Sequence, residues 1–246
     1  MSRSVRKSIA MLACLFLIGV LTTGCMYPDS QRKQPYRPSL ESIAIVQIAV
    51  DQFQERTGVL PIKNSESDTP FYEKYIIDFK KLIGPYLSEP PSNAFENGGS
   101  DYYVLVDVEK DPTVKLMSLV AIQKVNDVQR AVDDYALSHP GEWPLLNPAH
   151  SQGWFTLDYG KLSVKEPDIP SFYSPQSLQL LIHEEQGHVV IDYASDLMAI
   201  IQKKGIETFE AEGDIRALLI EDHPYVPVKS FPYEWNDQQP VLLKER

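Results

Sequence analysis

The sequence predicts an α+β fold of two tandem modules, each a helix followed by a β-hairpin, which share a core after a signal peptide and a flexible tether. The first observation is an internal repeat, V-Q-x-A-V-D-x-aromatic, at residues 46–53 and again at 128–135. The second is that helical and then strand-like hydrophobic patterns follow both copies in the same order. The third is size, because a module of about 80 residues is marginally stable alone.

Further matches follow the repeat at nearly the same offset. They pair Gly58–Pro61 with Gly141–Pro144, Ile77–Leu82 with Leu157–Leu162, and Glu89-Pro90 with Glu166-Pro167. The octet alone is expected by chance about once in a chain of this length. We therefore infer a duplication from the ordered series. The alternative is two unrelated amphipathic helices that share common residues.

Residues 1–24 have the pattern of an export signal. Arg3, Arg6 and Lys7 form a basic start, and the apolar run from Ile9 to Leu21 is too short for a comfortable transmembrane span. Residues 25–38 are polar and rich in proline, which predicts a flexible tether that spans roughly 20 Å as a coil. An ordinary cleaved signal peptide and an uncleaved anchor remain alternatives.

Leu21-Thr22-Thr23-Gly24-Cys25 resembles the lipobox of bacterial lipoproteins, although Thr22 stands where leucine is commonest in that family. The resemblance implies cleavage before Cys25 and a diacylglyceryl group on its sulfur. Cys14 would leave with the signal, so Cys25 is the one cysteine of the mature chain. The lipobox, the Cys25-Met26-Tyr27-Pro28 start and the general layout also make the chain similar to the YphF-like lipoproteins of Bacillus-type bacteria. That similarity implies no activity, substrate or catalytic residue.

The first module is predicted at residues 39–120. A helix begins near Ser39, a suitable N-cap, and ends at Gly58. A short helix is expected from Ile76 to Ile83. Alternating apolar residues at Tyr102–Val108 and Thr113–Val120 predict a hairpin.

The second module is predicted at residues 121–204, with a helix over 121–137, paired strands at 178–182 and 189–193, and a helix over 196–204. Residues 205–246 form an acidic segment rich in proline and aromatic residues. Within it, Ile215–Ile220 fits either a strand or a helix. Residues 224–240 are expected to pack over the body as extended chain.

Charge and motifs limit the possible functions. The net charge is −11 and residues 1–24 carry three bases and no acid, which leaves −14 for the rest. This acidic charge on residues 25–246 argues against binding nucleic acid through phosphate contacts. No phosphate-binding loop, dinucleotide fingerprint or serine-hydrolase motif is present. We expect no enzyme activity and no cofactor.

Two histidines and two aspartates invite a catalytic interpretation that their spacing does not favour. His183 and His188 are five residues apart, whereas the zinc-protease motif places two histidines four apart on a helix, so exposed hairpin residues are expected and no metal site. Asp78 and Asp158 occupy equivalent places in the repeat and would suit acid/base work as a pair. Capping of helix N-termini is the preferred reading for both.

The aromatic residues Trp143, Trp154, Tyr159 and Tyr173 form the best candidate for a ligand site. Aromatic rings near proline-rich loops stack on sugars or cradle proline-rich peptides. Packing in the core or against loops is the alternative.

These observations together predict a lipid-anchored protein on the extracytoplasmic face of the cell membrane. The leading hypothesis is a non-catalytic binding or scaffold protein whose partner is an envelope protein or a cell-wall component. The alternative is a small solute-binding lipoprotein with its ligand between the two modules. A cell-wall hydrolase is a third reading.

Overall fold

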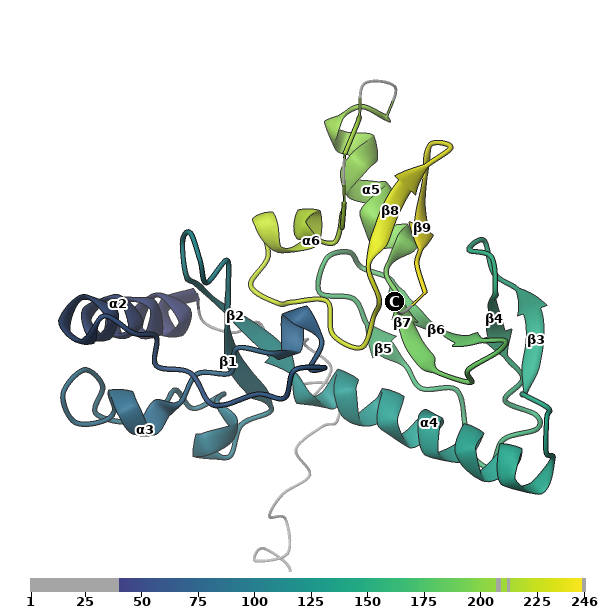
Figure 1. Cartoon of the computed structure of the whole chain (residues 1–246), viewed down its shortest axis with the longest axis horizontal. Coiled ribbons are helices and arrows are strands. Elements are labelled where there is room, and N and C mark those ends of the chain that lie inside the picture. The colour runs from purple at the N-terminus through teal and green to yellow at the C-terminus, as the bar shows by residue number, and fades with distance from the viewer. Residues whose placement is uncertain (1–39, 207–208, 212, 245–246) are drawn as a thin grey trace, which may run out of the picture. The chain divides into compact units, whose positions relative to one another are not determined.

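The computed structural model describes residues 40–206, 209–211 and 213–244, which fold as a mixture of helices and mainly antiparallel strands (Figure 1). This confirms the predicted α+β class. The described residues belong to one compact unit, Pro38–Arg246. The predicted signal peptide, the tether and Cys25 lie outside the described residues.

The first module begins with helix α2 (Leu40–Thr57), whose Val46, Ala49 and Val50 are buried against the sheet side. Strands β1 (Asp101–Val106) and β2 (Thr113–Ser118) pair as the predicted antiparallel hairpin. Short elements lie between the helix and the hairpin: η2 (Phe71–Glu73), α3 (Phe79–Leu82) and η3 (Phe95–Asn97).

The short helix expected from Ile76 to Ile83 is confined to α3, and its first residues are extended instead. Ile76 bridges to Val104 of β1, and Ile77 bridges to Ile62. These bridges add two short extended pieces beside the hairpin. β-Branched isoleucines favour this pleated surface, and Asp78 starts the helical turn by accepting a hydrogen bond from the Lys80 N–H.

The second module also begins with a helix and ends with a hairpin, but three further short strands lie between them. Helix α4 (Leu119–Ser138) is followed by β3 (Leu145–Pro148), β4 (Trp154–Leu157), β5 (Ile169–Pro170), β6 (Ser177–His183) and β7 (Val189–Asp192). β3 pairs with β4, β4 with β6, and β6 with β7, while the short β5 pairs with the start of β6. The β6–β7 hairpin was predicted, whereas β3 and β4 were not.

The repeated glutamine has the same contacts in both modules. Gln47 of α2 donates to the Pro112 carbonyl at 2.9 Å and accepts from the Val114 N–H at 2.7 Å. Gln129 of α4 donates to the Gly187 carbonyl at 3.0 Å and accepts from the Val189 N–H at 2.7 Å. We call this pair of contacts the glutamine clamp, because one amide ties the helix to the strand that ends each hairpin.

The repeated aspartate holds each glutamine in place. Asp51 accepts from the Gln47 side-chain amide at 2.8 Å, and Asp133 accepts from Gln129 at 2.9 Å. Both aspartates lie one helical turn after their glutamine. The V-Q-x-A-V-D motif thus has one physical role in both copies, which supports the inferred duplication.

The hairpin β1–β2 joins two hydrophobic clusters. Its Tyr103, Leu105, Val114 and Leu116 belong to the smaller cluster with α2 and α3. The alternate residues Val104, Val106 and Met117 belong to the larger cluster with α4 and the second sheet. Because successive strand residues point to opposite faces, the modules share this hairpin between their cores.

The C-terminal part contains α5 (Ala194–Lys204), α6 (Ala217–Glu221), β8 (Tyr233–Asn236) and β9 (Gln239–Leu242). The expected helix over 196–204 is present as α5, and the ambiguous segment at 215–220 ends in the short helix α6. Residues expected as an extended tail instead include the β8–β9 hairpin, which packs beside α5 (Figure 1). Its turn residues Asp237 and Gln238 have φ of 47° and 59°, and this dipeptide lacks the Asn-Gly or Asp-Gly signal of such turns.

Replacing Gln129 with Ala is expected to lower the free energy of unfolding by about 2 kcal/mol, because it leaves the Gly187 carbonyl and the Val189 N–H without their partner. Urea unfolding of the purified protein measures this change. Gln123→Ala is the matched control, since Gln123 bonds Asp127 on the exposed side of the same helix. Its expected cost is below about 0.5 kcal/mol. Equal losses in the two variants would argue against the clamp.

Candidate functional site

The predicted aromatic cluster is dispersed over the second module. Trp154 of β4 is only 1% exposed, with its ring edge-to-face against His183 at 5.0 Å and tilted against Phe231 at 5.8 Å. Trp143 lies over Gly187, where an added Cβ would come within 2.4 Å of the indole ring. Only glycine fits at position 187, because any side chain would collide with the indole ring. The Gly187 carbonyl also accepts the hydrogen bond from the Gln129 side chain.

The two tyrosines of the predicted cluster pack elsewhere. Tyr173 donates its hydroxyl to the Tyr225 carbonyl at 3.1 Å and has its ring edge-to-face against Tyr193. Tyr159 packs against the larger cluster. No ring–ring contact joins any two of the four predicted residues, all of which are described. Packing, the alternative reading, accounts for where these rings lie.

His183 differs from the exposed hairpin residue that was expected. The β6–β7 hairpin is present, but His183 is 0% exposed because β6 continues through it and turns its side chain toward Trp154. Its Nδ1 accepts from the Glu185 N–H at 3.3 Å, while its Nε2 and the Trp154 Nε1 are buried without a hydrogen-bond partner. Burial lowers the pKa of His183 below its ordinary 6.5, and the nearby Lys244 acts in the same direction.

Asp78 and Asp158 cap equivalent turns. Asp78 accepts from the Lys80 N–H at 3.2 Å, and Asp158 accepts from the Gly160 N–H at 3.0 Å. Their backbone N–H groups donate to Pro61 and Pro144, both at 2.7 Å. Each carboxylate serves its own turn. Asp78 is the N-cap of α3, as the sequence predicted, whereas the turn after Asp158 does not continue into a helix.

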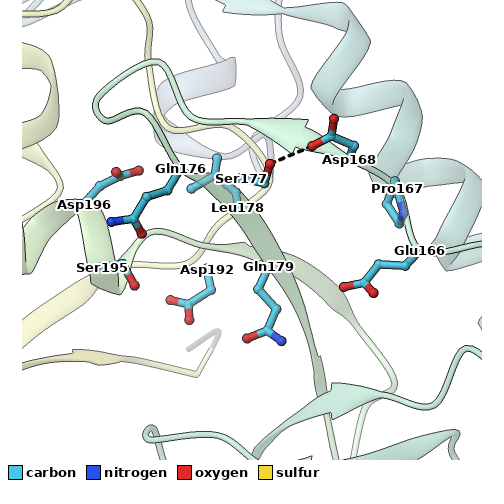
Figure 2. Close-up of a pocket in the computed structure, with 10 residues that line it drawn as sticks. All are labelled: Glu166, Pro167, Asp168, Gln176, Ser177, Leu178, Gln179, Asp192, Ser195 and Asp196. Atoms are coloured by element: carbon cyan, nitrogen blue, oxygen red, sulfur yellow. Dashed lines mark hydrogen bonds between the residues drawn. The ribbon is translucent and has the colours of Figure 1, made fainter.

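An acidic cavity of about 560 Å³ lies between the strand β6, the segment before β5 and the start of α5 (Figure 2). Four carboxylates line it, together with two glutamines and two serines, and no Lys, Arg or His is among its described lining residues. The carboxylates are Glu166, Asp168, Asp192 and Asp196. So many negative charges favour a cationic occupant and disfavour an anion.

Internal hydrogen bonds hold most of these carboxylates in place. Asp168 accepts from the Ser177 hydroxyl at 2.6 Å, as Figure 2 shows. Asp192 accepts from the Tyr233 hydroxyl at 2.7 Å, and the buried Asp196 accepts from the Ser171 hydroxyl at 2.7 Å. Within the part of the chain that the structure describes, no three His, Cys, Asp or Glu side chains are placed to hold a metal ion.

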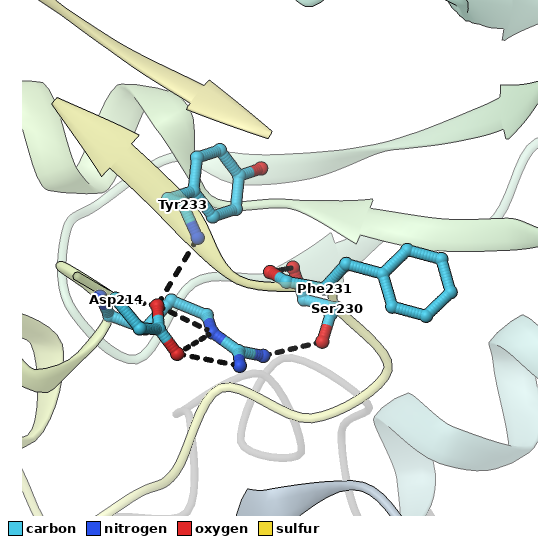
Figure 3. Close-up of polar contacts among 5 residues, drawn as sticks. Asp214, Ser230, Phe231 and Tyr233 are labelled. Atoms are coloured by element: carbon cyan, nitrogen blue, oxygen red, sulfur yellow. Dashed lines mark hydrogen bonds and ion pairs between the residues drawn. The ribbon is translucent and has the colours of Figure 1, made fainter. Parts of the chain in front are cut away.

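A second cavity of about 410 Å³ lies between residues 68–71 and the C-terminal part, and its one buried cation is Arg216. Arg216 binds both oxygens of Asp214 and donates to the Ser230 carbonyl, while Asp214 also accepts from the Tyr233 N–H (Figure 3). The guanidinium carbon lies 5.0 Å from the centre of the Tyr72 ring. These contacts engage all three guanidinium nitrogens, and they fasten residues 214–216 to the segment at Ser230.

The outward face of α2 carries an exposed apolar stripe, which we define as Leu40, Ala44, Ile45 and Ile48. Leu40, Ile45 and Ile48 are 71%, 48% and 56% exposed. In the repeat, Ile45 and Ile48 correspond to Asp127 and Arg130 of α4, which form an exposed ion pair. The two helices therefore share the clamp but present different outward surfaces.

α4 also exposes two apolar side chains, Val120 and Leu137, but they lie near opposite ends of the helix. Single exposed apolar residues are common on protein surfaces. A contiguous row is less usual and is typical of an interaction surface.

Comparison with known protein families matches part of the chain to a described domain. Residues 39–118 match the model of the YphF family N-terminal domain. The matched segment runs from the start of α2 to the end of β2, so it is the first module that resembles this domain. The match supports the YphF-like resemblance drawn from the sequence. Neither the curated proteins nor the solved structures contain a significant match to the chain. Over the described residues, no helix combines the length and apolarity needed to cross a bilayer.

The low pKa of His183 predicts a dependence of stability on pH. Because the unfolded histidine titrates near 6.5 and the folded one below it, the unfolded state takes up the proton first as the pH falls. The free energy of unfolding is therefore expected to drop as the pH is lowered from 7 through about 6.5 and below. Urea titrations between pH 5 and 8 measure the slope. A His183→Gln variant should show a flatter slope than the parent protein, and parallel profiles would contradict this assignment.

Proposed function

We propose that the chain is a lipid-anchored protein of the extracytoplasmic membrane face that binds another envelope protein without catalysing a reaction. The basic start, the short apolar run and the cysteine-terminated Leu21–Cys25 motif support the anchor. The apolar stripe on α2 is the observation that carries the binding role. The match of residues 39–118 to the YphF family domain fits a YphF-like lipoprotein.

The comparison of α2 with α4 supports a binding role for the apolar stripe. Both helices bury one face and clamp a strand with the same glutamine, so the fold makes the same demand on each. At the positions that correspond to Ile45 and Ile48, α4 carries an exposed ion pair, so the fold accepts charged residues there. The apolar residues of α2 are therefore not needed for folding, whereas an exposed apolar row suits a partner that covers it.

Removal of the anchor is expected to release the protein from the membrane. A Cys25→Ala variant has no sulfur for the diacylglyceryl group, and without acyl chains an acidic body has little affinity for an anionic bilayer. Cell fractionation and mass spectrometry of the mature N-terminus measure this. A native N-terminus without lipid mass would refute the anchor.

The binding role is tested in the same cells with a photoreactive amino acid at position 48. We expect a protein crosslink from position 48 and a much weaker one from position 130, its equivalent in α4. The crosslink should weaken in the Cys25→Ala background because the chain is no longer held beside its partner. Equal labelling at both positions, or none, would argue against binding through α2.

A second candidate is a solute-binding lipoprotein, and the acidic cavity favours it. The cavity volume of about 560 Å³ is in the range of small-molecule sites. Its lining comes from residues 166–196, within the second module, and not from between the modules as the sequence reading supposed. The four carboxylates favour an organic cation over a neutral or anionic solute.

The solute hypothesis predicts thermal stabilisation by amines. Spermidine, choline and arginine, at concentrations well above their dissociation constants, are expected to raise the melting temperature, whereas citrate is not. A Glu166→Gln/Asp168→Asn variant should respond less than the parent, with Asp134→Asn/Glu142→Gln as a variant of equal charge change at exposed positions of the second module. Absence of any shift, or an equal shift in both variants, would exclude this site.

A further inference from the structure

We propose that the apolar stripe of α2 docks a basic amphipathic helix from another envelope protein. This inference rests on the proposed binding function and deepens it by stating the chemistry of the partner. It draws on the shape of the stripe, the charges around it, and the length of chain between Cys25 and α2.

The stripe has the geometry of a helix-packing ridge. Leu40, Ala44 and Ile48 are four residues apart and so form one row along the helix, with Ile45 beside it. The buried residues Val46, Ala49 and Val50 occupy the opposite face. The small Ala44 between larger neighbours leaves a depression of the kind that accepts a side chain of a second helix.

Acidic residues surround the stripe. Glu41 lies beside it, and Asp51 and Glu55 continue the same outward face toward the C-terminus of α2. All three are exposed, and Arg56 in the last turn is the one basic residue of the helix. A partner that covers the apolar row must therefore place its polar flanks against carboxylates, which favours lysine and arginine there.

The same charges disfavour a second copy of the chain and a bilayer. In a symmetric pair the acids of one α2 would face those of the other, between molecules of net charge −11. Helices that lie on bilayers carry lysine and arginine on the polar face, and α2 has the opposite charge there. A basic helix is the occupant that gains from both the apolar row and its surroundings.

The tether sets where this partner is found. Leu40 follows Cys25 by 15 residues, and a chain of that length spans at most about 50 Å. With Cys25 anchored, α2 therefore starts within that distance of the membrane. The partner helix therefore lies within a similar height of the bilayer.

The test uses the full lipidated chain in phosphatidylcholine nanodiscs and a fluorescent leucine–lysine amphipathic peptide as the probe. A leucine–glutamate peptide of the same apolar pattern controls for hydrophobic binding alone. We expect the leucine–lysine peptide to bind at least tenfold more tightly than its acidic counterpart, with affinity that falls as salt is raised. Anisotropy titration gives both dissociation constants.

An Ile45→Asp/Ile48→Arg variant separates the stripe from general charge attraction. The substitution leaves the net charge unchanged and installs the ion pair that α4 already carries at the equivalent positions, so the variant should fold. We expect it to weaken leucine–lysine binding at least tenfold. The control Asp127→Ala/Arg130→Ala, also neutral in net charge, should leave binding unchanged.

Other results overturn the inference. Equal affinity for the two peptides would reject a basic helix as the partner. Binding that is insensitive to the Ile45→Asp/Ile48→Arg change would reject it as well. A dimer of the full chain in ultracentrifugation that this variant dissolves would assign the stripe to a second copy. Flotation of the Cys25→Ala chain with phosphatidylglycerol vesicles, lost in the variant, would assign it to the bilayer.

The two proposals fail separately. A protein crosslink from position 48 with no preference for the leucine–lysine peptide would keep partner binding and reject a basic helix. Absence of both signals would reject both proposals.

Discussion

The glutamine clamp is the interaction on which the rest of the fold depends. A helix that crosses a sheet meets backbone groups that neither element satisfies by itself, and each unpaired group is costly when removed from water. Gln47 and Gln129 each provide one donor and one acceptor to the strand that completes their hairpin. Asp51 and Asp133 restrict the orientation of the amides, so the clamp fixes both the rotation of the helix and the register of the strand beneath it.

The shared hairpin β1–β2 joins the two modules into a single folded unit. β1 and β2 are buried on both faces, one toward α2 and the other toward the second sheet. The end of α6 and the chain after it also contact the shared hairpin. Tyr225 forms a β-bridge with Leu116 of β2, and the Lys115 side chain donates to the carbonyls of Ile220 and His223. Each module keeps its own clamp, but neither has a complete core without the other.

Local patterns predicted the helices α2, α4 and α5, both hairpins of the repeat and the α+β class, because these depend on periodicity and on nearby turns. The missed strands give weak local signals. Leu145–Pro148 is short, ends in proline and pairs with the neighbouring β4 in an irregular register, and β4 is completed by β6, farther along the chain. His183 was misjudged because burial follows from the length of β6. The acidic cavity combines residues near 166, 178 and 194, which no spacing along the chain connects. The α2 stripe was visible in the sequence, but only burial values distinguish it from a wide core face.

The distribution of core residues along the chain also sets the order in which the protein folds. The smaller cluster is complete once Tyr225 is available. The larger one draws on Ile215, Leu219, Val226, Val228, Tyr233 and Leu242, so it cannot close until almost the last strand has emerged. A chain that appears from its N-terminus therefore carries exposed apolar surface for most of its synthesis and needs protection from aggregation meanwhile. Under the proposed export to the extracytoplasmic face this delay is an advantage, because the chain stays unfolded, and able to pass through a narrow channel, until nearly all of it has been made.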